Sequence, residues 1–211
     1  GYDDVIASNP GTSNLTFLLN TQQPFAINSG SLNFLGNYST AGVTPEWITA
    51  NDFDGDGKTD IAVTYSGSAF VGVSLNNSST GDISFGAEQQ LPSPGNGIRI
   101  ASQDLDGDGL PEIVSIHQVF GSPSVTVFKN NSTPGNLNFS AGVTYALSRT
   151  PIALALGDVN TDGKPDIVIT GQNGAAAPTN AVMVMQNQMP AIVIAIDTQP
   201  GTTYSVCDGA T

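Results

Sequence analysis

The sequence predicts an all-β fold built from repeated antiparallel units, and three observations support this prediction. An acidic nine-residue segment occurs three times, starting at Asp52, Asp104 and Asp158. The copies start 52 and 54 residues apart, a period typical of repeats that each form one small sheet. Each copy lies between short apolar runs rich in β-branched residues, which is the pattern of strands buried on both faces.

Four strands are expected in each period. In the first period, one apolar run leads into the acidic segment at 47–50 and a second leaves it at 61–63. A third strand follows at 70–75, and a polar turn separates it from a fourth at 83–85. The later periods repeat this order, with runs at 98–101, 113–116, 125–128 and 137–139, then at 152–156, 167–169 and 182–185.

Such units bury both faces only by packing against one another, and stacked radially they form a β-propeller. The sequence therefore predicts β-propeller blades that are four-stranded antiparallel repeats of about 52–56 residues. The propeller portion is expected to span 1–190, as about half of a larger propeller. Its blades are expected at about 1–40 (partial), 41–92, 93–147 and 148–188 (partial).

Both end blades are expected to have three strands. Near the start, Asp4 aligns with Asp60, the last position of an acidic segment, so only the later strands of that blade follow, near 15–19 and 32–34. At the other end, no fourth strand of the earlier type follows 182–185.

The acidic segments predict three calcium sites. Each has oxygen-bearing side chains at positions 1, 3, 5 and 9 and glycine at position 6, a ligand set that suits a hard cation. The glycines Gly57, Gly109 and Gly163 are expected to adopt the left-handed conformation that folds the loop back on the ion. Position 7 is expected to contribute a backbone carbonyl. The candidate metal ligands are Asp52, Asp54, Asp56, Lys58, Asp60, Asp104, Asp106, Asp108, Leu110, Glu112, Asp158, Asn160, Asp162, Lys164 and Asp166.

Two alternatives compete with these sites. An EF-hand or dockerin loop requires an acid at position 12, where this chain has Val63, Ser115 and Ile169 inside predicted strands, so both are rejected. Metal-free acidic turns are the other alternative. Several carboxylates in one tight loop repel one another unless a cation lies among them, which favours the metal. Asn160 lacks a charge, so the third site is expected to bind more weakly.

Composition narrows the classes of partner. The net charge is −13, and eleven of the 18 acidic side chains lie in the three segments. Five Lys and Arg residues argue against binding to nucleic acid or to anionic membranes. The longest apolar run, 191–196, is too short to span a bilayer. Abundant Asn, Ser, Thr and Gly, together with calcium sites, favour an extracellular or cell-surface location.

Catalytic candidates are few. His117 is the only histidine, and a hydrogen-bonded structural role is expected for it rather than catalysis. No base lies near Ser205 or Cys207 in the sequence, so nucleophilic catalysis has no support. Trp47 is expected to pack in the core, with a sugar-stacking surface as the alternative.

These residues resemble the FG-GAP/VCBS repeats of integrin α-subunit propellers and of many secreted bacterial proteins. The resemblance covers roughly 3–188 and rests on the three acidic segments, with Phe85-Gly86-Ala87 similar to the Phe-Gly signature. It implies a calcium ion between the first two strands of each blade. Residues 191–211 resemble a linker or the start of an immunoglobulin-like module, which would pair Cys207 with a cysteine beyond Thr211.

The function expected is that of a non-enzymatic, calcium-stabilised propeller module of a large secreted or cell-surface protein. Its role would be adhesion or protein–protein binding, with the remaining blades of the same propeller and a protein or glycan ligand as partners. The alternative is a carbohydrate-binding propeller, either a lectin or a domain ancillary to a polysaccharide lyase. An enzyme is the least favoured interpretation.

Overall fold

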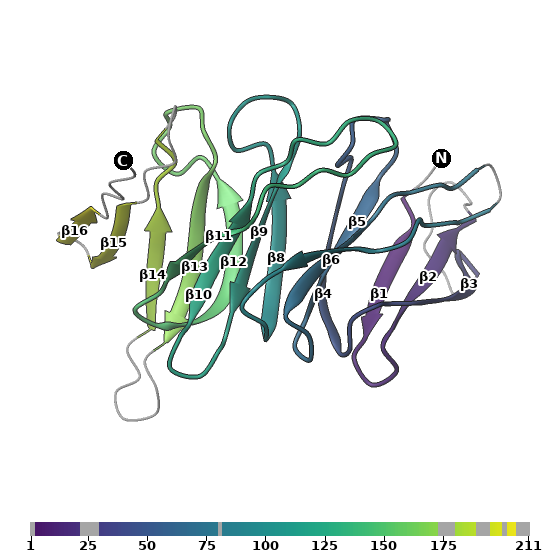
Figure 1. Ribbon diagram of the computed structural model, residues 1–211, viewed down its shortest axis with the longest axis horizontal. Coiled ribbons are helices and arrows are strands. Elements are labelled where there is room, and N and C mark those ends of the chain that lie inside the picture. Colours follow the sequence, from purple (N-terminus) through teal and green to yellow (C-terminus); the bar gives the residue numbers. More distant parts are fainter. Residues whose placement is uncertain are drawn as a thin grey trace.

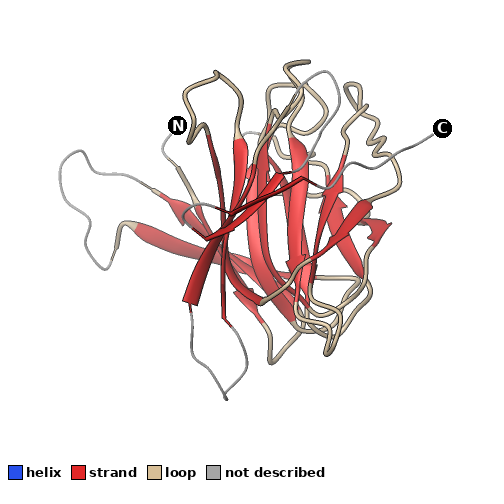
Figure 2. Ribbon diagram, turned by 90° about the vertical axis from the view of Figure 1, so that its left-hand side faces the viewer, coloured by secondary structure: helices blue, strands red, loops and turns tan. Residues whose placement is uncertain are grey.

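The computed structural model describes residues 3–21, 30–79, 82–172 and 180–188, and the backbone of 195–199 and 202–205. The described residues form strands, turns and loops, and none of them forms a helix (Figure 2). Four antiparallel sheets follow one another along the molecule in chain order (Figure 1). The all-β prediction is confirmed, and the four sheets are consistent with propeller blades.

The first sheet has the order β1-β2-β3 and contains β1 (Val5–Asn9), β2 (Asn14–Asn20) and β3 (Leu32–Ser39). The second sheet has the order β4-β5-β6-β7 and contains β4 (Pro45–Asn51), β5 (Asp60–Tyr65), β6 (Phe70–Ser74) and β7 (Gln89–Pro92). Each strand pairs with the next one along the chain, as in a simple meander.

The third sheet has the order β8-β9-β10-β11 and contains β8 (Gly97–Gln103), β9 (Glu112–His117), β10 (Ser124–Phe128) and β11 (Val143–Ala146). The fourth sheet contains β12 (Thr150–Gly157), β13 (Asp166–Gln172), β14 (Asn180–Met185), β15 (Ala195–Gln199) and β16 (Thr202–Ser205), paired in that order.

The prediction of three strands in the last blade was wrong. Ile196 and Asp197 of β15 pair with Met185 and Val184 of β14, and β16 pairs with β15. The end of the apolar run at 191–196 therefore supplies a neighbouring strand, since an unpaired strand edge favours further pairing. The assignment of 191–211 to a linker or a separate module stays a prediction, and Cys207 lies outside the described residues.

The fourth strands of the second and third sheets were also placed wrongly. Residues 83–85 and 137–139 do not lie beside the third strand of their sheet. They fold back as short hairpins, through the bridges Asn76↔Phe85 and Asn130↔Phe139. Their apolar side chains pack on the clusters between neighbouring sheets, which explains the strand-like pattern. The fourth strands β7 and β11 follow a few residues later.

Three apolar clusters hold the sheets together, one at each junction. Between the first and second sheets lie residues such as Phe17 and Ile61. Phe53 and Phe128 belong to the cluster between the second and third sheets, and Met183 belongs to the cluster between the third and fourth. Successive residues of a strand point to opposite faces, so one strand contributes to two junctions and is buried on both sides.

The predicted burial on both faces is confirmed for β5 and β9, in which every residue is buried. It was wrong for β4, β8 and β12, which keep partly exposed side chains. At the inner side of the array, β8 contacts both β4 and β12.

The prediction that Trp47 packs in the core was wrong for the same reason. Trp47 lies on β4 with 45 % of its surface exposed, and the Cζ atom of Arg99 on β8 lies 4.3 Å from its ring centroid. A cation over the ring holds the indole at the surface.

Candidate metal centres

The three acidic segments form the loops that connect the first and second strands of a sheet. The first loop (52–60) joins β4 to β5, the second loop (104–112) joins β8 to β9, and the third loop (158–166) joins β12 to β13. The predicted place of these loops is confirmed.

The side chain of the position-1 aspartate accepts hydrogen bonds from the backbone of its own loop. In the first loop, Asp52 Oδ1 accepts a hydrogen bond from Gly55 N at 2.8 Å and Oδ2 accepts one from Gly57 N at 2.8 Å. The second and third loops repeat this pair of bonds around Asp104 and Asp158. The loop therefore closes on a carboxylate in all three copies.

The predicted left-handed glycines are confirmed. Gly57, Gly109 and Gly163 have φ angles of 87°, 92° and 83°. A side chain at this position would be strained, because only glycine adopts such angles without a steric cost. The glycine lets the loop turn sharply enough for its N–H group to reach the position-1 carboxylate.

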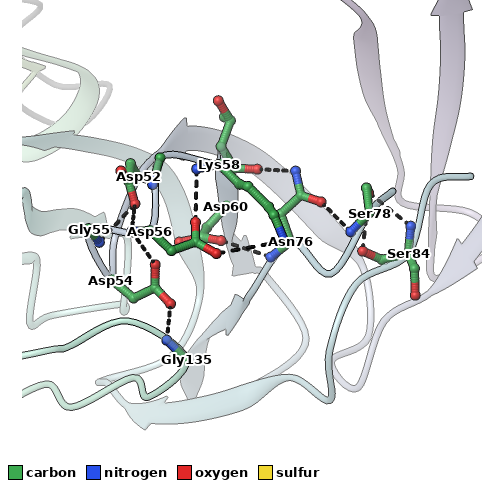
Figure 3. Close-up of polar contacts among 12 residues, drawn as sticks. Asp52, Asp54, Gly55, Asp56, Lys58, Asp60, Asn76, Ser78, Ser84 and Gly135 are labelled. Atoms are coloured by element: carbon green, nitrogen blue, oxygen red, sulfur yellow. Dashed lines mark hydrogen bonds and ion pairs between the residues drawn. The ribbon is translucent and has the colours of Figure 1, made fainter. Parts of the chain in front are cut away.

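The position-9 carboxylate ties the loop to the sheet. Asp60 Oδ1 accepts a hydrogen bond from Asn76 N at 2.8 Å (Figure 3). Its Oδ2 accepts one from Phe53 N at 2.9 Å. Glu112 and Asp166 make the same two kinds of bond in their sheets. This carboxylate is buried in all three sheets, so it joins the start of the loop to the end of the third strand.

Carboxylate oxygens converge in two of the three loops. In the first loop, Asp52, Asp54 and Asp60 each have one carboxylate oxygen that lies within 4.8 Å of the oxygens of the other two. In the second loop the corresponding group is Asp104, Asp106 and Asp108. Among the candidate carboxylates of these two loops, Asp56 and Glu112 stand outside the groups.

The third loop gathers no such group among the residues that the structure describes. Asn160 Nδ2 donates to Asp162 Oδ2 at 3.0 Å, so the amide uses an oxygen that could bind an ion. Thr161 has a φ angle of 64°, at a position where the first two loops have glycine. Weaker calcium binding by the third loop stays a prediction. So does the contribution of backbone carbonyls by the position-7 residues Lys58, Leu110 and Lys164.

The buried position-9 acids Asp60 and Glu112 have raised pKa values, mainly because they are buried and in smaller part because the other loop carboxylates repel them. Burial raises the pKa of the Asp60 carboxyl above its ordinary value, and the charges of Asp54 and Asp56 raise it further. Burial also raises the pKa of Glu112, with a contribution from the other carboxylates of its loop. The exposed Asp158 differs, because the N–H of Gly163 and its neighbours lower its pKa. A bound cation would relieve the repulsion in the first two loops.

The donor set of the first two loops fits calcium. Oxygens that share one calcium ion lie at most about 5 Å apart, because each lies roughly 2.3–2.6 Å from it. The spacing within 4.8 Å in both groups meets this limit, and carboxylate oxygens are the hard ligands that calcium prefers. Calcium bound there would cross-link the first two strands and neutralise the clustered charge.

Comparison with known proteins agrees with this geometry. A family model described as FG-GAP-like repeat matches residues 52–115 and 104–169. The chain belongs to the FG-GAP-like repeat family. Each match begins at the position-1 aspartate of a loop and ends in the second strand of the next sheet. No curated protein matches the chain.

This FG-GAP-like repeat protein has one repeated residue that the sequence analysis missed. An asparagine follows the third strand of the repeat, and its backbone N–H donates to the position-9 carboxylate. The bond measures 2.8 Å from Asn76 to Asp60 and 3.2 Å from Asn130 to Glu112. Asn187 makes the same bond to Asp166 at 2.8 Å. In the sequence, this residue is recognisable only as an asparagine 16 to 21 residues after position 9. Turns are so rich in asparagine that this spacing does not identify it.

The first sheet carries a fourth copy of this bond. Asn20 N donates to Asp4 Oδ1 at 2.8 Å, and Asn20 Nδ2 donates to Asp3 O at 3.2 Å. Asn76 makes the equivalent side-chain bond to Thr59 O at 2.8 Å. The predicted alignment of Asp4 with Asp60 is therefore confirmed by their shared hydrogen-bonding role.

The predicted structural role of His117 is supported. His117 is fully buried in β9, and its Nδ1 lies 3.1 Å from Gly95 O. A carbonyl only accepts, so Nδ1 carries the proton and Nε2 accepts from Ser115 Oγ at 2.9 Å. Both ring nitrogens are thus engaged within the fold.

A lysine lies against the second loop. Lys129 Nζ contacts Asp106 Oδ2 and lies 3.6 Å from Asp108 Oδ2. The equivalent residues in the neighbouring sheets are Leu75 and Gln186, so a lysine at this position occurs only beside the second loop. In the first loop the nearby charge comes instead from Lys58, whose Nζ lies 3.8 Å from Asp56 Oδ2. An ammonium group beside the second loop would compete with a metal ion for the same oxygens.

We expect Lys129→Gln to strengthen calcium binding by the second loop about 1.4- to fivefold, because a half-exposed ion pair contributes roughly 0.2–1 kcal/mol. Isothermal titration with calcium measures the change. Arg99→Gln, which removes the same charge from a strand outside the loops, is the control. Equal or weaker binding by Lys129→Gln would show that the lysine does not compete.

Proposed function

We propose that this chain is a calcium-stabilised, non-enzymatic propeller module of a secreted or cell-surface protein that works in adhesion or protein–protein binding. The observation that carries the proposal is the convergence of three carboxylates in each of two equivalent loops. FG-GAP-like repeats form propeller-type modules that are generally structural or binding units and are typical of extracellular proteins, which supports the location and the absence of catalysis. Among the described residues, no helix is long and apolar enough to cross a membrane.

Calcium has a structural role in this proposal. Each ion would bridge two connected strands and offset the burial and the carboxylate repulsion that raise the pKa of Asp60 and Glu112. Because the unfolded chain lacks the assembled ligands, the binding free energy stabilises the fold. The remaining blades of the propeller and a protein ligand are the partners that we propose.

Thermal unfolding with calcium and with a chelator tests the structural role. We expect each occupied site to add about 2.7 kcal/mol to the free energy of unfolding when calcium is present at about 100 times the dissociation constant. Asp54→Asn removes a converging carboxylate and should abolish the stabilisation from one site. Asp82→Asn makes the same charge change outside the loops and is the control. An unfolding temperature that is identical in calcium and in chelator would refute the proposal.

Carbohydrate binding is a second candidate, and the exposed Trp47 favours it. A partly exposed indole on the inner strand β4 offers an apolar surface of the kind that stacks on sugar rings. Thr49 and Ser102, whose hydroxyl oxygens lie 2.9 Å apart across β4 and β8, add polar groups close by. A glycan array separates the two candidates, since calcium-dependent binding to one defined sugar that is lost in Trp47→Ala would favour this one.

A further inference from the structure

Two hydrogen bonds cross from the third sheet to the first loop, which belongs to the second sheet. Asn130 Nδ2 donates to Phe53 O at 2.8 Å. Gly135 N, in the hairpin that follows, donates to Asp54 Oδ2 at 2.6 Å (Figure 3). The first bond holds the backbone at position 2, and the second holds a converging carboxylate directly.

The same bond joins the fourth sheet to the second loop. Asn187 Nδ2 donates to Leu105 O at 2.6 Å. Asn130 and Asn187 are both buried, and a buried amide donor has no water to replace a lost partner. The repeated contact therefore links one sheet's loop to the asparagine of the next sheet.

The position-2 side chain is buried in the two loops that accept these hydrogen bonds and exposed in the third loop. Phe53 at position 2 of the first loop is fully buried, and Leu105 in the second loop is 3 % exposed. Val159, at the same position of the third loop, is 56 % exposed. Asp54, which the next sheet covers, is buried, and electrostatic attraction to a cation is stronger in such a drier environment.

We infer that each calcium loop is completed by the following blade, with Asn130 acting as a positioning residue for the first loop and Asn187 for the second. This inference rests on the proposed calcium function. The asparagines do not contact the ion. They fix the loop backbone between two ligand positions, as outer-shell hydrogen bonds do in other metal sites. Metal binding in one blade is then coupled to the packing of the next.

The experiment isolates one loop at a time in the full chain. Asp104→Asn with Asp158→Asn leaves the first loop as the copy with all its carboxylates. In this background we expect Asn130→Ala to weaken calcium binding by roughly 10- to 100-fold, as measured by isothermal titration. Asn131→Ala, which removes the neighbouring exposed amide, should change it less than about twofold.

The reciprocal pair of substitutions tests whether each asparagine affects calcium binding only by the loop of the preceding sheet. Asp52→Asn with Asp158→Asn leaves the second loop complete. We expect Asn187→Ala to weaken binding here by the same factor, and to leave the first loop unchanged in the first background. A purely structural role would lower the unfolding temperature without this selectivity. If Asn130→Ala does not fold, the measurement on Asn187→Ala tests the inference by itself.

The outcomes separate the two claims. No calcium binding by the unaltered protein refutes the proposed function itself. Binding that both Asn130→Ala and Asn187→Ala preserve within about twofold would overturn the positioning role while leaving the calcium function intact. An equal loss at both loops from Asn187→Ala would also overturn it, because that pattern reports general destabilisation.

Discussion

Phe53→Ala is expected to lower the free energy of unfolding by about 3–5 kcal/mol, the range for a fully buried phenylalanine. Phe53 occupies position 2 of the first loop and has no exposed surface. Its ring packs edge to face against Phe139 in the hairpin that follows β10, with centroids 5.9 Å apart. Its removal leaves a cavity between two sheets, which the β framework cannot close by a small shift.

Chemical denaturation measures this effect, with Phe120→Ala as the matched control. Phe120 is fully exposed, so its removal should change the free energy of unfolding by less than about 0.5 kcal/mol. The backbone bonds of Phe53 to Asp60 and Asn130 survive the substitution, because they use main-chain atoms. A loss below about 1 kcal/mol would show that the ring does not hold the second and third sheets together.

Acidification is expected to destabilise the protein through His117 by about 3 kcal/mol, since a pKa difference of one corresponds to about 1.4 kcal/mol. Burial lowers the pKa of His117 from 6.5 to about 4, against a smaller opposing effect of the hydrogen bond to Gly95. Between these values the unfolded chain binds a proton that the native state does not bind, so the free energy of unfolding falls as the pH falls. The contribution is complete above pH 6.5 and is lost as the pH approaches 4.

The physical reason lies in the contacts of the ring. The protonated ring would carry a donor at Nε2, where Ser115 Oγ now donates. His117→Asn keeps a donor near Gly95 O and removes the titration with a modest loss of volume. The stability difference between the two proteins, measured from about pH 7 to about pH 4 at constant calcium, should shift by about 3 kcal/mol. Parallel curves would contradict the prediction and assign acid sensitivity to the loop carboxylates.

Patterns within short segments of the sequence were sufficient to predict much of this fold. The strands β5 and β9 follow from runs of β-branched residues, and the loops follow from the spacing of aspartate and glycine over nine residues. Asp52 and Gly57 meet because the chain between them is short, so their contact is encoded within one segment. The match of Asp4 to Asp60 was also readable, because the residues around both positions follow the same local order.

Long-range packing explains the errors. Residues 83–85 have the pattern of a strand, yet Phe85 stacks on Phe17 of the neighbouring sheet with centroids 5.2 Å apart. Trp47 has an apolar side chain next to a buried strand, yet it lies on the inner strand, where the sheets converge and surface remains exposed. Periodicity reports that a side chain favours burial but not which neighbour buries it.

The repeat, the strand-forming runs and the nine-residue acidic loops can be read from the amino-acid order, because each depends on residues close together in the chain. The packing of the sheets sets which carboxylates converge, which strands line the inner side of the array, and which asparagine reaches which loop. Asn130 and Phe53 are 77 residues apart, and Asn187 and Leu105 are 82 residues apart. Contacts at such separations arise only when complete sheets pack face to face.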